Sequence, residues 1–230
     1  MPSFFKKSKA QPSVSPDPLV IYHISQNLSG KLTVTSNTPN AYAYSITLSI
    51  RKAWRDTIEV AIHRSIESTY QQHADVVGHC LIQTAQGKFL ETRFDAYGQD
   101  IKLERSGSRA NLAKANYDLV VPGLGKCKWT HDLDSLTGSD KRLKLVENGS
   151  GAVLARFGGA QNGMSEFGVL EVYDQRVARD QNWCGLCILT AVCVFAREER
   201  SRERKKKING VVGTVSNWGG LLTMGIPVGP

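Results

Sequence analysis

The chain has 230 residues, of which 41% are hydrophobic and 22% are charged. This balance is typical of a globular protein with a sizeable buried core, and it excludes a chain that is disordered throughout. The formal net charge of +8 favours anionic partners such as nucleic acid, phosphoinositides or acidic lipid surfaces.

The chain has five cysteines, and its N-terminal segment lacks an apolar stretch of signal-peptide length. An odd number of cysteines without a secretory signal argues against a disulfide framework. We therefore expect reduced thiols in an intracellular protein, cytoplasmic or peripheral to a membrane, and not a secreted one.

Residues 1–17 are rich in Pro, Ser and Lys and show little apolar periodicity, so they are expected to form a disordered leader. The pattern changes at Leu19, where apolar and β-branched residues begin. Residues 208–230 are glycine-rich and apolar without a clear period, which fits a flexible tail or an edge element that folds back. The globular domain is therefore expected over residues 18–207.

Between Leu19 and Tyr173 the chain is a succession of short runs separated mostly by Gly, Asn or Asp turns. Alternation of polar and apolar residues places one face of a strand on a core and the other in water. Residues 57–63 fit a strand or, with the preceding residues 51–56, a helix; the strand is favoured. Many short strands at intervals of roughly ten residues indicate an all-β sandwich or barrel. The predicted strands are 19–25, 31–35, 41–50, 57–63, 75–84, 88–94, 100–104, 117–121, 127–130, 142–147, 152–157 and 166–173.

Residues Trp183–Ala196 carry no charge and indicate a single helix, with Asp180 or Asn182 available as its N-cap. A helix that is apolar on every face must be surrounded on every face, by a protein core or by a bilayer. Its 14 residues cover roughly 21 Å at about 1.5 Å per residue, against a hydrocarbon core of about 30 Å. The length favours a buried core helix, and the basic residues that follow keep a membrane span as the alternative.

Four segments of the chain resemble one protein family. Residues 142–157 (RLKLVENGSGAVLARF) resemble a strand–turn–strand unit, residues 166–175 (EFGVLEVYDQ) a last strand, and residues 181–205 (QNWCGLCILTAVCVFAREERSRERK) an apolar helix with a charged end. Residues 123–130 (GLGKCKWT) are similar to a short tryptophan-containing strand of fungal family members. Together these segments resemble the Tubby C-terminal-like superfamily, whose relatives include the LURP-one-related proteins and the phospholipid scramblases.

The resemblance implies a mainly β fold, a closed antiparallel β-barrel of about twelve strands around a central hydrophobic C-terminal helix at about residues 181–206. Such a barrel is wider than the roughly eight strands that side chains alone can fill, and an apolar helix would occupy its interior. The resemblance also implies association with phosphoinositide or a membrane surface. No segment matches the phosphoinositide-binding motif of Tubby proteins, so none of those residues is carried over. The expected core residues of the helix are Trp183, Leu186, Ile188, Leu189, Val192, Val194 and Phe195.

The pair Cys184 and Cys187 has the spacing of a dithiol redox site at a helix N-terminus, where the dipole lowers a thiol pKa. A thioredoxin-like motif follows an apolar strand, whereas the polar residues 176–182 precede this pair. Burial in the core is the default interpretation, because free cysteine is among the most buried residue types.

Other residues that often carry chemistry lack the required pattern. His73, His79 and Cys80 do not have the spacing of a second zinc-binding pair, so neither a metal nor a cofactor is expected. Gly123–Gly125 and Gly158–Gly159 are interpreted as turns, because no helix and no Lys-Ser/Thr follows them. With no catalytic motif, the chain is not expected to be an enzyme. Surface or packing roles are expected for His23, His63 and His131.

The segment Arg197–Lys207 holds seven basic and three acidic residues, so 7 − 3 = +4 of the net charge lies in one stretch. A solvated helix end, whose cations complement the helix dipole, is the first interpretation. Contact with anionic lipid is the second, and contact with nucleic acid is the third. The candidate lipid-binding residues are Arg200, Arg202, Arg204, Lys205, Lys206 and Lys207.

These patterns lead to the hypothesis of a non-enzymatic, intracellular Tubby-like domain that binds phosphoinositide or another anionic membrane lipid. One alternative is a membrane-anchored, scramblase-like protein held by residues 183–196. The other is a thiol redox protein at Cys184 and Cys187. Nucleic acid is the less favoured partner, and the sequence indicates no particular protein partner.

Overall fold

The computed structural model describes a strand-rich body and the two helices that follow it. The predicted leader and tail fall outside the described residues, apart from Asp17 and Ile208. The described residues are 17–27, 31–36, 38–39, 41–53, 55–64, 76–83, 89–94, 99–106, 115–132, 142–159 and 166–208.

The described residues form twelve β-strands, and each lies where a strand was predicted from apolar content or alternation. The ambiguous segment 57–63 belongs to a ten-residue strand, so the strand interpretation is confirmed there. The strands are β1 (Val20–Gln26), β2 (Leu32–Ser36), β3 (Tyr44–Ala53), β4 (Arg55–Arg64), β5 (Val76–Gln83), β6 (Phe89–Phe94), β7 (Gln99–Ser106), β8 (Asn116–Val121), β9 (Gly125–His131), β10 (Arg142–Glu147), β11 (Val153–Gly159) and β12 (Glu166–Val172).

All the strands belong to one antiparallel sheet in which neighbours in the sequence are also neighbours in space. β1 pairs with β12 on one side and with β2 on the other, so the order of neighbours returns to its start. We refer to the twelve strands and their pairings as the ring. The prediction of a mainly β chain with antiparallel strands and a C-terminal helix is confirmed.

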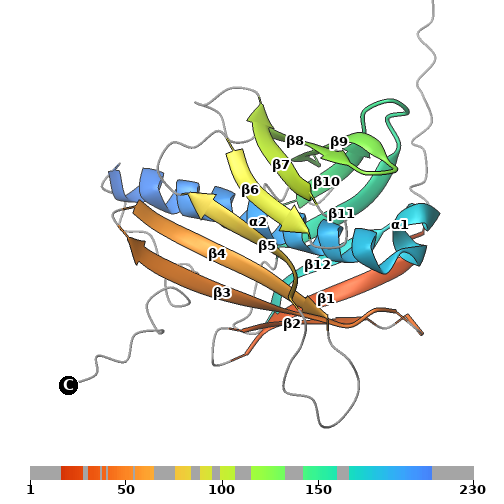
Figure 1. Cartoon of the computed structure of the whole chain (residues 1–230), viewed down its shortest axis with the longest axis horizontal. Helices are drawn as coiled ribbons and strands as arrows, with labels where there is room; N and C mark the ends of the chain where they lie inside the picture. The colour runs from red at the N-terminus through yellow and green to blue at the C-terminus, as the bar shows by residue number, and fades with distance from the viewer. Residues whose placement is uncertain are drawn as a thin grey trace, which may run out of the picture.

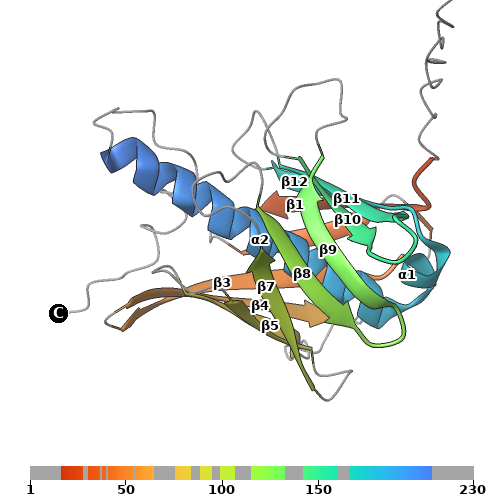
Figure 2. The same cartoon turned by 90° about the horizontal axis from the view of Figure 1, so that it is seen from above.

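The long helix α2 (Gln181–Ile208) passes through the space that the ring surrounds (Figures 1 and 2). Its residues from Cys184 to Ala196 are all buried. The strands supply the cover because their inward positions are apolar: Cys127 and Trp129 alternate with exposed or half-buried lysines in β9. The predicted core helix is therefore confirmed. Its core residues Leu186, Ile188, Leu189, Val192, Val194 and Phe195 are at most 5% exposed, and Trp183 is half-buried.

Among the described residues, no helix combines the length and the apolarity that a membrane crossing requires. The segment 183–196, which was one of the alternatives as a membrane anchor, is covered by strands instead. Burying its side chains from water stabilises the fold by about 1.5–3 kcal/mol for each large apolar residue.

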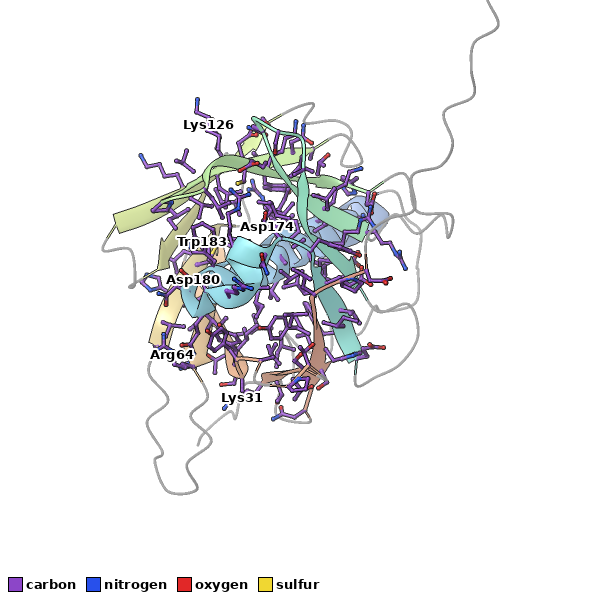
Figure 3. All side chains as sticks on the ribbon, turned by 90° about the vertical axis from the view of Figure 1, so that its right-hand side faces the viewer. Lys31, Arg64, Lys126, Asp174, Asp180 and Trp183 are labelled. Carbon is purple, nitrogen blue, oxygen red and sulfur yellow. The ribbon has the colours of Figure 1, made fainter. Side chains whose placement is uncertain are left out.

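The start of α2 is fixed by a cap and by a tyrosine. Asp180, one of the two predicted caps, accepts hydrogen bonds through Oδ1 from the backbone N–H groups of Asn182 at 2.8 Å and Trp183 at 3.3 Å. The hydroxyl of Tyr44, at the beginning of β3, donates to the carbonyl oxygen of Gln181 at 2.5 Å. Figure 3 views this end of the ring, with Asp180 and Trp183 near the axis. The beginning of β3 therefore marks the end of the ring at which α2 begins.

A short helix that the sequence did not reveal, α1 (Gln175–Arg179), precedes α2. Its N-cap Asp174 accepts hydrogen bonds from the backbone N–H groups of Arg176 at 2.8 Å and Val177 at 3.4 Å. Only Val177 is buried in α1, so a single apolar residue left no periodic signal to predict it from.

The interpretation of Gly158–Gly159 as a turn is wrong, because both residues belong to strand β11. A Cβ atom at Gly159 would lie 2.4 Å from two ring carbons of Phe195, a distance that real contacts do not reach. The glycine is thus required by the close approach of the helix to the strand. Gly123 was correctly assigned to a turn: it lies in the link from β8 to β9 with φ of 79°. Gly125, with φ of 86°, is the first residue of β9.

We expect Leu189→Asp to abolish folding, because it places an unpaired carboxylate at a position with no solvent exposure. The cost of several kcal/mol is comparable to the whole stability of a typical domain, about 5–15 kcal/mol. Val120→Asp is the matched control, since Val120 is 59% exposed on β8. Circular dichroism melting should show a cooperative transition for the control and none for Leu189→Asp. A wild-type melting temperature for Leu189→Asp would contradict the buried position of the helix.

Candidate functional site at the exit of the central helix

The sequence of α2 changes from apolar to charged at Arg197, and this is where the helix leaves the ring. The burial continues one turn further, because Glu198 is 2% exposed and Glu199 is 6% exposed. Ser201 and Arg202 are half-buried, and the helix then continues to Ile208 (Figure 2). We call the region around residues 197–202 the exit.

A histidine from the ring meets the first carboxylate of the exit. Nε2 of His131 lies 3.1 Å from Oε1 of Glu198, and the two side chains are 4% and 2% exposed. His131 is the last residue of β9 and follows the inward positions of Cys127 and Trp129, so the strand period places it on the helix side. The role predicted for His131, surface or packing, is refined here to a buried partner of a carboxylate.

Arg202 holds both carboxylates from the outer side. It pairs with Glu198 across one helical turn at 3.8 Å and forms a hydrogen bond with Glu199. Glu198 is therefore held between His131 on the ring and Arg202 on the helix. A buried carboxylate needs such partners, because an isolated charge in this environment would be costly.

Arg197 lies further inside than the other basic residues of the exit. Its guanidinium carbon lies 5.6 Å from the centre of the Tyr117 ring, a cation–π distance. Burial lowers the pKa of Arg197, although arginine stays protonated at neutral pH. The same burial raises the pKa of the Tyr117 phenol. The two groups thus meet between α2 and β8, on the inner side of the ring.

A second buried carboxylate lies beside the exit. Asp132 follows β9, is 5% exposed and forms ion pairs with two cations of the neighbouring strands. Nζ of Lys144 lies 3.4 Å from Oδ1 of Asp132, and Nε of Arg156 lies 3.1 Å from Oδ2. Arg156 also covers the ring of Tyr173, with 5.3 Å to its centroid. Asp132 thus joins β9, β10 and β11 at the end of the ring through which α2 leaves.

Of the six predicted lipid-binding residues, all lie on the last turns of α2, beyond or at the exit. Arg202 is the one whose side chain is described, and its guanidinium group pairs with the buried carboxylates of Glu198 and Glu199. Sequence reasoning missed the buried pair of His131 and Glu198, the buried Glu199 and the separate buried Asp132. Only the inward position of His131 in the alternation of β9 gave a signal for it.

The cysteine pair predicted as an alternative redox site is buried. Cys184 has no exposure and Cys187 is 5% exposed. Burial raises the pKa of Cys184 to about 11 and that of Cys187 well above its ordinary value. Sγ of Cys184 donates to the carbonyl oxygen of Val177 at 3.1 Å, a bond that also favours the protonated thiol. The geometry is that of core cysteines, which was the default interpretation.

In the described part of the chain, no group of three or more His, Cys, Asp or Glu residues could hold a metal ion. His73 lies outside the described residues. His79 and Cys80 are neighbours in β5, so their side chains point to opposite faces of the sheet.

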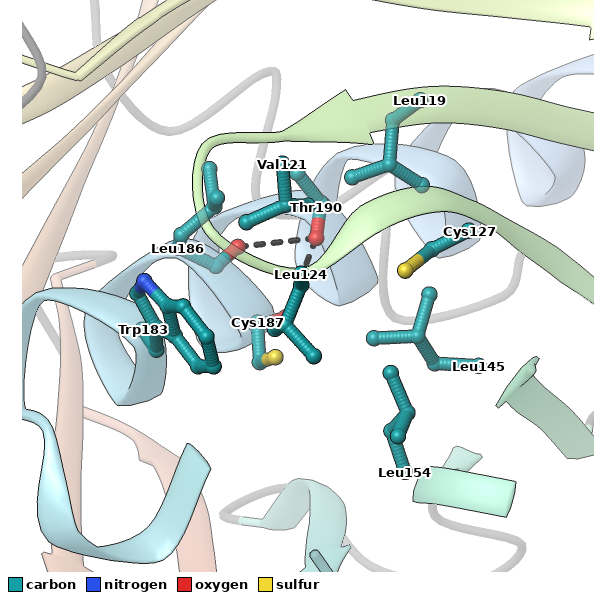
Figure 4. A pocket seen from close by; sticks show the side chains of 10 residues that line it. All are labelled: Leu119, Val121, Leu124, Cys127, Leu145, Leu154, Trp183, Leu186, Cys187 and Thr190. Carbon is teal, nitrogen blue, oxygen red and sulfur yellow. Dashed lines mark hydrogen bonds between the residues drawn. The ribbon is translucent and has the colours of Figure 1, made fainter. Parts of the chain in front are cut away.

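A small apolar pocket lies between α2 and the β8–β9 turn (Figure 4). Its volume is about 10 Å³, which leaves room for one water molecule at most. The hydroxyl of Thr190 at its edge donates to the carbonyl oxygen of Leu186 at 2.8 Å and accepts from Nε1 of Trp129 at 3.0 Å. Burial raises the pKa of the Cys127 thiol in its wall to about 11. The pocket is lined by Leu119, Val121, Leu124, Cys127, Leu145, Leu154, Trp183, Leu186, Cys187 and Thr190, which offer apolar contact and no ready acid or base.

Comparison of the chain with models of protein families, with curated proteins and with solved structures gives no match.

We expect the native thiols to be unreactive towards an aromatic disulfide reagent at mild pH, because all five cysteines are buried. Unfolding in guanidinium should release all five for rapid reaction. Val120→Cys is the positive control, since this exposed position adds one thiol that reacts in the native state. A fast-reacting native thiol that Cys184→Ala removes would instead support the redox alternative.

We expect Glu198→Ala to lower the free energy of unfolding by about 3 kcal/mol, because it leaves His131 and Arg202 without their shared carboxylate. Glu166→Ala removes the same group from an exposed position and should change stability by less than about 0.5 kcal/mol. Urea unfolding of both variants measures the difference. Equal stability of the two variants would show that the pairing at the exit contributes nothing to the fold.

Proposed function

We propose that this chain is a non-enzymatic, Tubby-like domain that binds anionic lipid headgroups at a membrane surface through the end of α2. One observation carries the proposal: the fold separates the charges of the segment Arg197–Lys207. Two of its three acidic residues, Glu198 and Glu199, are buried and paired, whereas most of its basic residues follow on a helix that leaves the ring.

The separation changes where the charge of the segment lies. In sequence, residues 197–207 carry 7 − 3 = +4. Arg202 pairs with the buried Glu198 and Glu199. The other residues of 200–207 are five basic residues and one acidic residue, or 5 − 1 = +4. The field at this end of the molecule therefore arises from a compact basic stretch.

A solvated helix end does not account well for a stretch of this size. Cations in the last turn complement the helix dipole, but that effect falls off within one turn. Clusters of four to eight Lys and Arg residues attract anionic lipid with about 1 kcal/mol per residue near the surface. The five basic residues of 200–207 other than Arg202 fall in this range.

The Tubby-like part of the proposal is supported by the arrangement of the elements. A closed barrel around a C-terminal apolar helix is what the resemblance implies, and here each strand has a neighbour on both sides while α2 runs inside. The membrane-anchor alternative would require residues 183–196 to leave their strands. The redox alternative would require an accessible thiolate, which the burial of Cys184 and Cys187 disfavours.

We expect the wild-type chain to float with vesicles that contain phosphatidylserine or a phosphoinositide, and not with pure phosphatidylcholine vesicles. The triple variant Lys205→Gln/Lys206→Gln/Lys207→Gln should bind roughly a hundredfold more weakly, because three cations contribute about 3 kcal/mol. Binding should also weaken as salt is raised, since surface charges are screened.

The matched control is Lys126→Gln/Lys128→Gln/Arg179→Gln, which removes the same charge from exposed or half-buried positions away from the exit. It should bind as the wild type does. Equal losses of vesicle binding in both triple variants would show that binding depends on net charge and not on the end of α2. If the wild-type chain does not bind anionic vesicles even at low salt, the proposed function is wrong.

A further inference from the structure

A second group of basic residues lies where β3 turns into β4. Arg51 and Lys52 stand near the end of β3, and Arg55 and Asp56 begin β4. The register pairs Lys52 with Asp56 and Ala53 with Arg55, so the two strands remain joined up to their last described residues. Three cations and one anion are thus brought to a single hairpin end, which we call the basic hairpin.

The register also fixes which end of the ring carries the basic hairpin. β3 begins at Tyr44, whose hydroxyl binds the first residue of α2, and it runs for ten residues. Ten residues in a strand cover roughly 33 Å, which brings Arg51–Ala53 to the other end of the ring. That end is the one through which α2 leaves. Figures 1 and 2 show the end of β3, the start of β4 and the end of α2 on the same side of the molecule.

The opposite end of the ring has a different charge balance. Arg176 lies 2.8 Å from Asp174 and 3.2 Å from Glu147, so its charge is met by two carboxylates. Asp180 caps α2 there, and the cations at this end include Lys126 near the start of β9 and Arg64, whose Nη2 donates to Asn182 at 3.4 Å (Figure 3). Cations and anions are mixed at this end. The exit end also has anions, such as the exposed Glu166 at the start of β12, but it combines residues 200–207 with the basic hairpin. Among the described residues, the excess of basic groups therefore lies at the exit end.

We propose that the basic hairpin is a second contact with the anionic membrane, so that the ring docks end-on with the exit facing the lipid. This inference rests on the proposed function, because the partner is the same. The basic hairpin and residues 200–207 lie apart at the same end of the ring, so both can contact a flat, extended anionic surface at once. Once one group is bound, the other meets the surface at a high effective concentration, so both contribute to affinity.

The first experiment compares three full-length variants in vesicle flotation. The hairpin variant Arg51→Gln/Lys52→Gln/Arg55→Gln should bind roughly a hundredfold more weakly than the wild type, at about fivefold per cation. The helix variant Lys205→Gln/Lys206→Gln/Lys207→Gln should lose a similar factor. The control variant Lys126→Gln/Lys128→Gln/Arg179→Gln should bind as the wild type does, and melting temperatures verify that all three fold.

The outcomes distinguish the two proposals. Loss of binding in both the hairpin and the helix variants, with the control intact, supports end-on docking. Wild-type binding by the hairpin variant and loss in the helix variant overturns the second contact and leaves the proposed function standing. Wild-type binding by both variants removes both proposals. Tighter binding to duplex RNA or DNA than to anionic vesicles, lost in the same variants, would assign the surface to nucleic acid and overturn the membrane proposal.

A second experiment reads the orientation directly. A single environment-sensitive dye is attached to Ala53→Cys, a position in the basic hairpin, or to Lys126→Cys at the opposite end. The native thiols are buried, so labelling is directed to the introduced one. Anionic vesicles should shift the emission of the dye at position 53 to the blue and leave the dye at position 126 unchanged. A shift at position 126 alone, or equal shifts at both positions, overturns end-on docking.

Discussion

The fold depends on one constraint: a helix without a polar face must be covered on every side. Between Cys184 and Ala196 no residue of α2 is charged, and the backbone polar groups of this segment are hydrogen-bonded within the helix, so it has no group that favours contact with water. A sheet that surrounds the helix meets this requirement, provided that every strand turns apolar residues inward. The alternation of the strands is therefore the counterpart of the uniform apolarity of α2, and each would be unstable in water without the other.

Where the helix leaves the ring its sequence becomes charged, so the exit residues must pair the charges that are still buried. Thr190 shows how a polar atom is tolerated deep inside, because its hydroxyl bonds the helix backbone and the indole N–H of Trp129. At the exit the same rule applies to full charges: Glu198 is shared by His131 and Arg202, and Asp132 is held by cations from two strands. Because Glu198 and Asp132 are buried and paired, they do not offset the positive charge of the protruding end of α2.

The sequence predicted the strands and the central helix well because both signals are local. Alternation over five to ten residues identifies a strand, and 14 residues without charge identify a buried helix. The exit cluster was not predicted because His131 and Glu198 are 67 residues apart, and nothing local links them. Gly159 was assigned to a turn for the same reason: its contact is with Phe195, and a glycine has no side chain to reveal a partner. The helix α1 was too short to show a period.

Length explains why the basic residues project at all. At about 1.5 Å per residue the 28 residues of α2 span roughly 42 Å, whereas the longest strands, with ten residues, span roughly 33 Å even without tilt. Arg197 is the seventeenth residue of α2, roughly 24 Å from its start, so the change from apolar to charged sequence falls near the rim of the ring. The end of α2 extends past the strands (Figure 2). A helix cut to the height of the ring would end near the buried carboxylates and Arg202, and the turns beyond Arg202 add four basic residues and one acidic one.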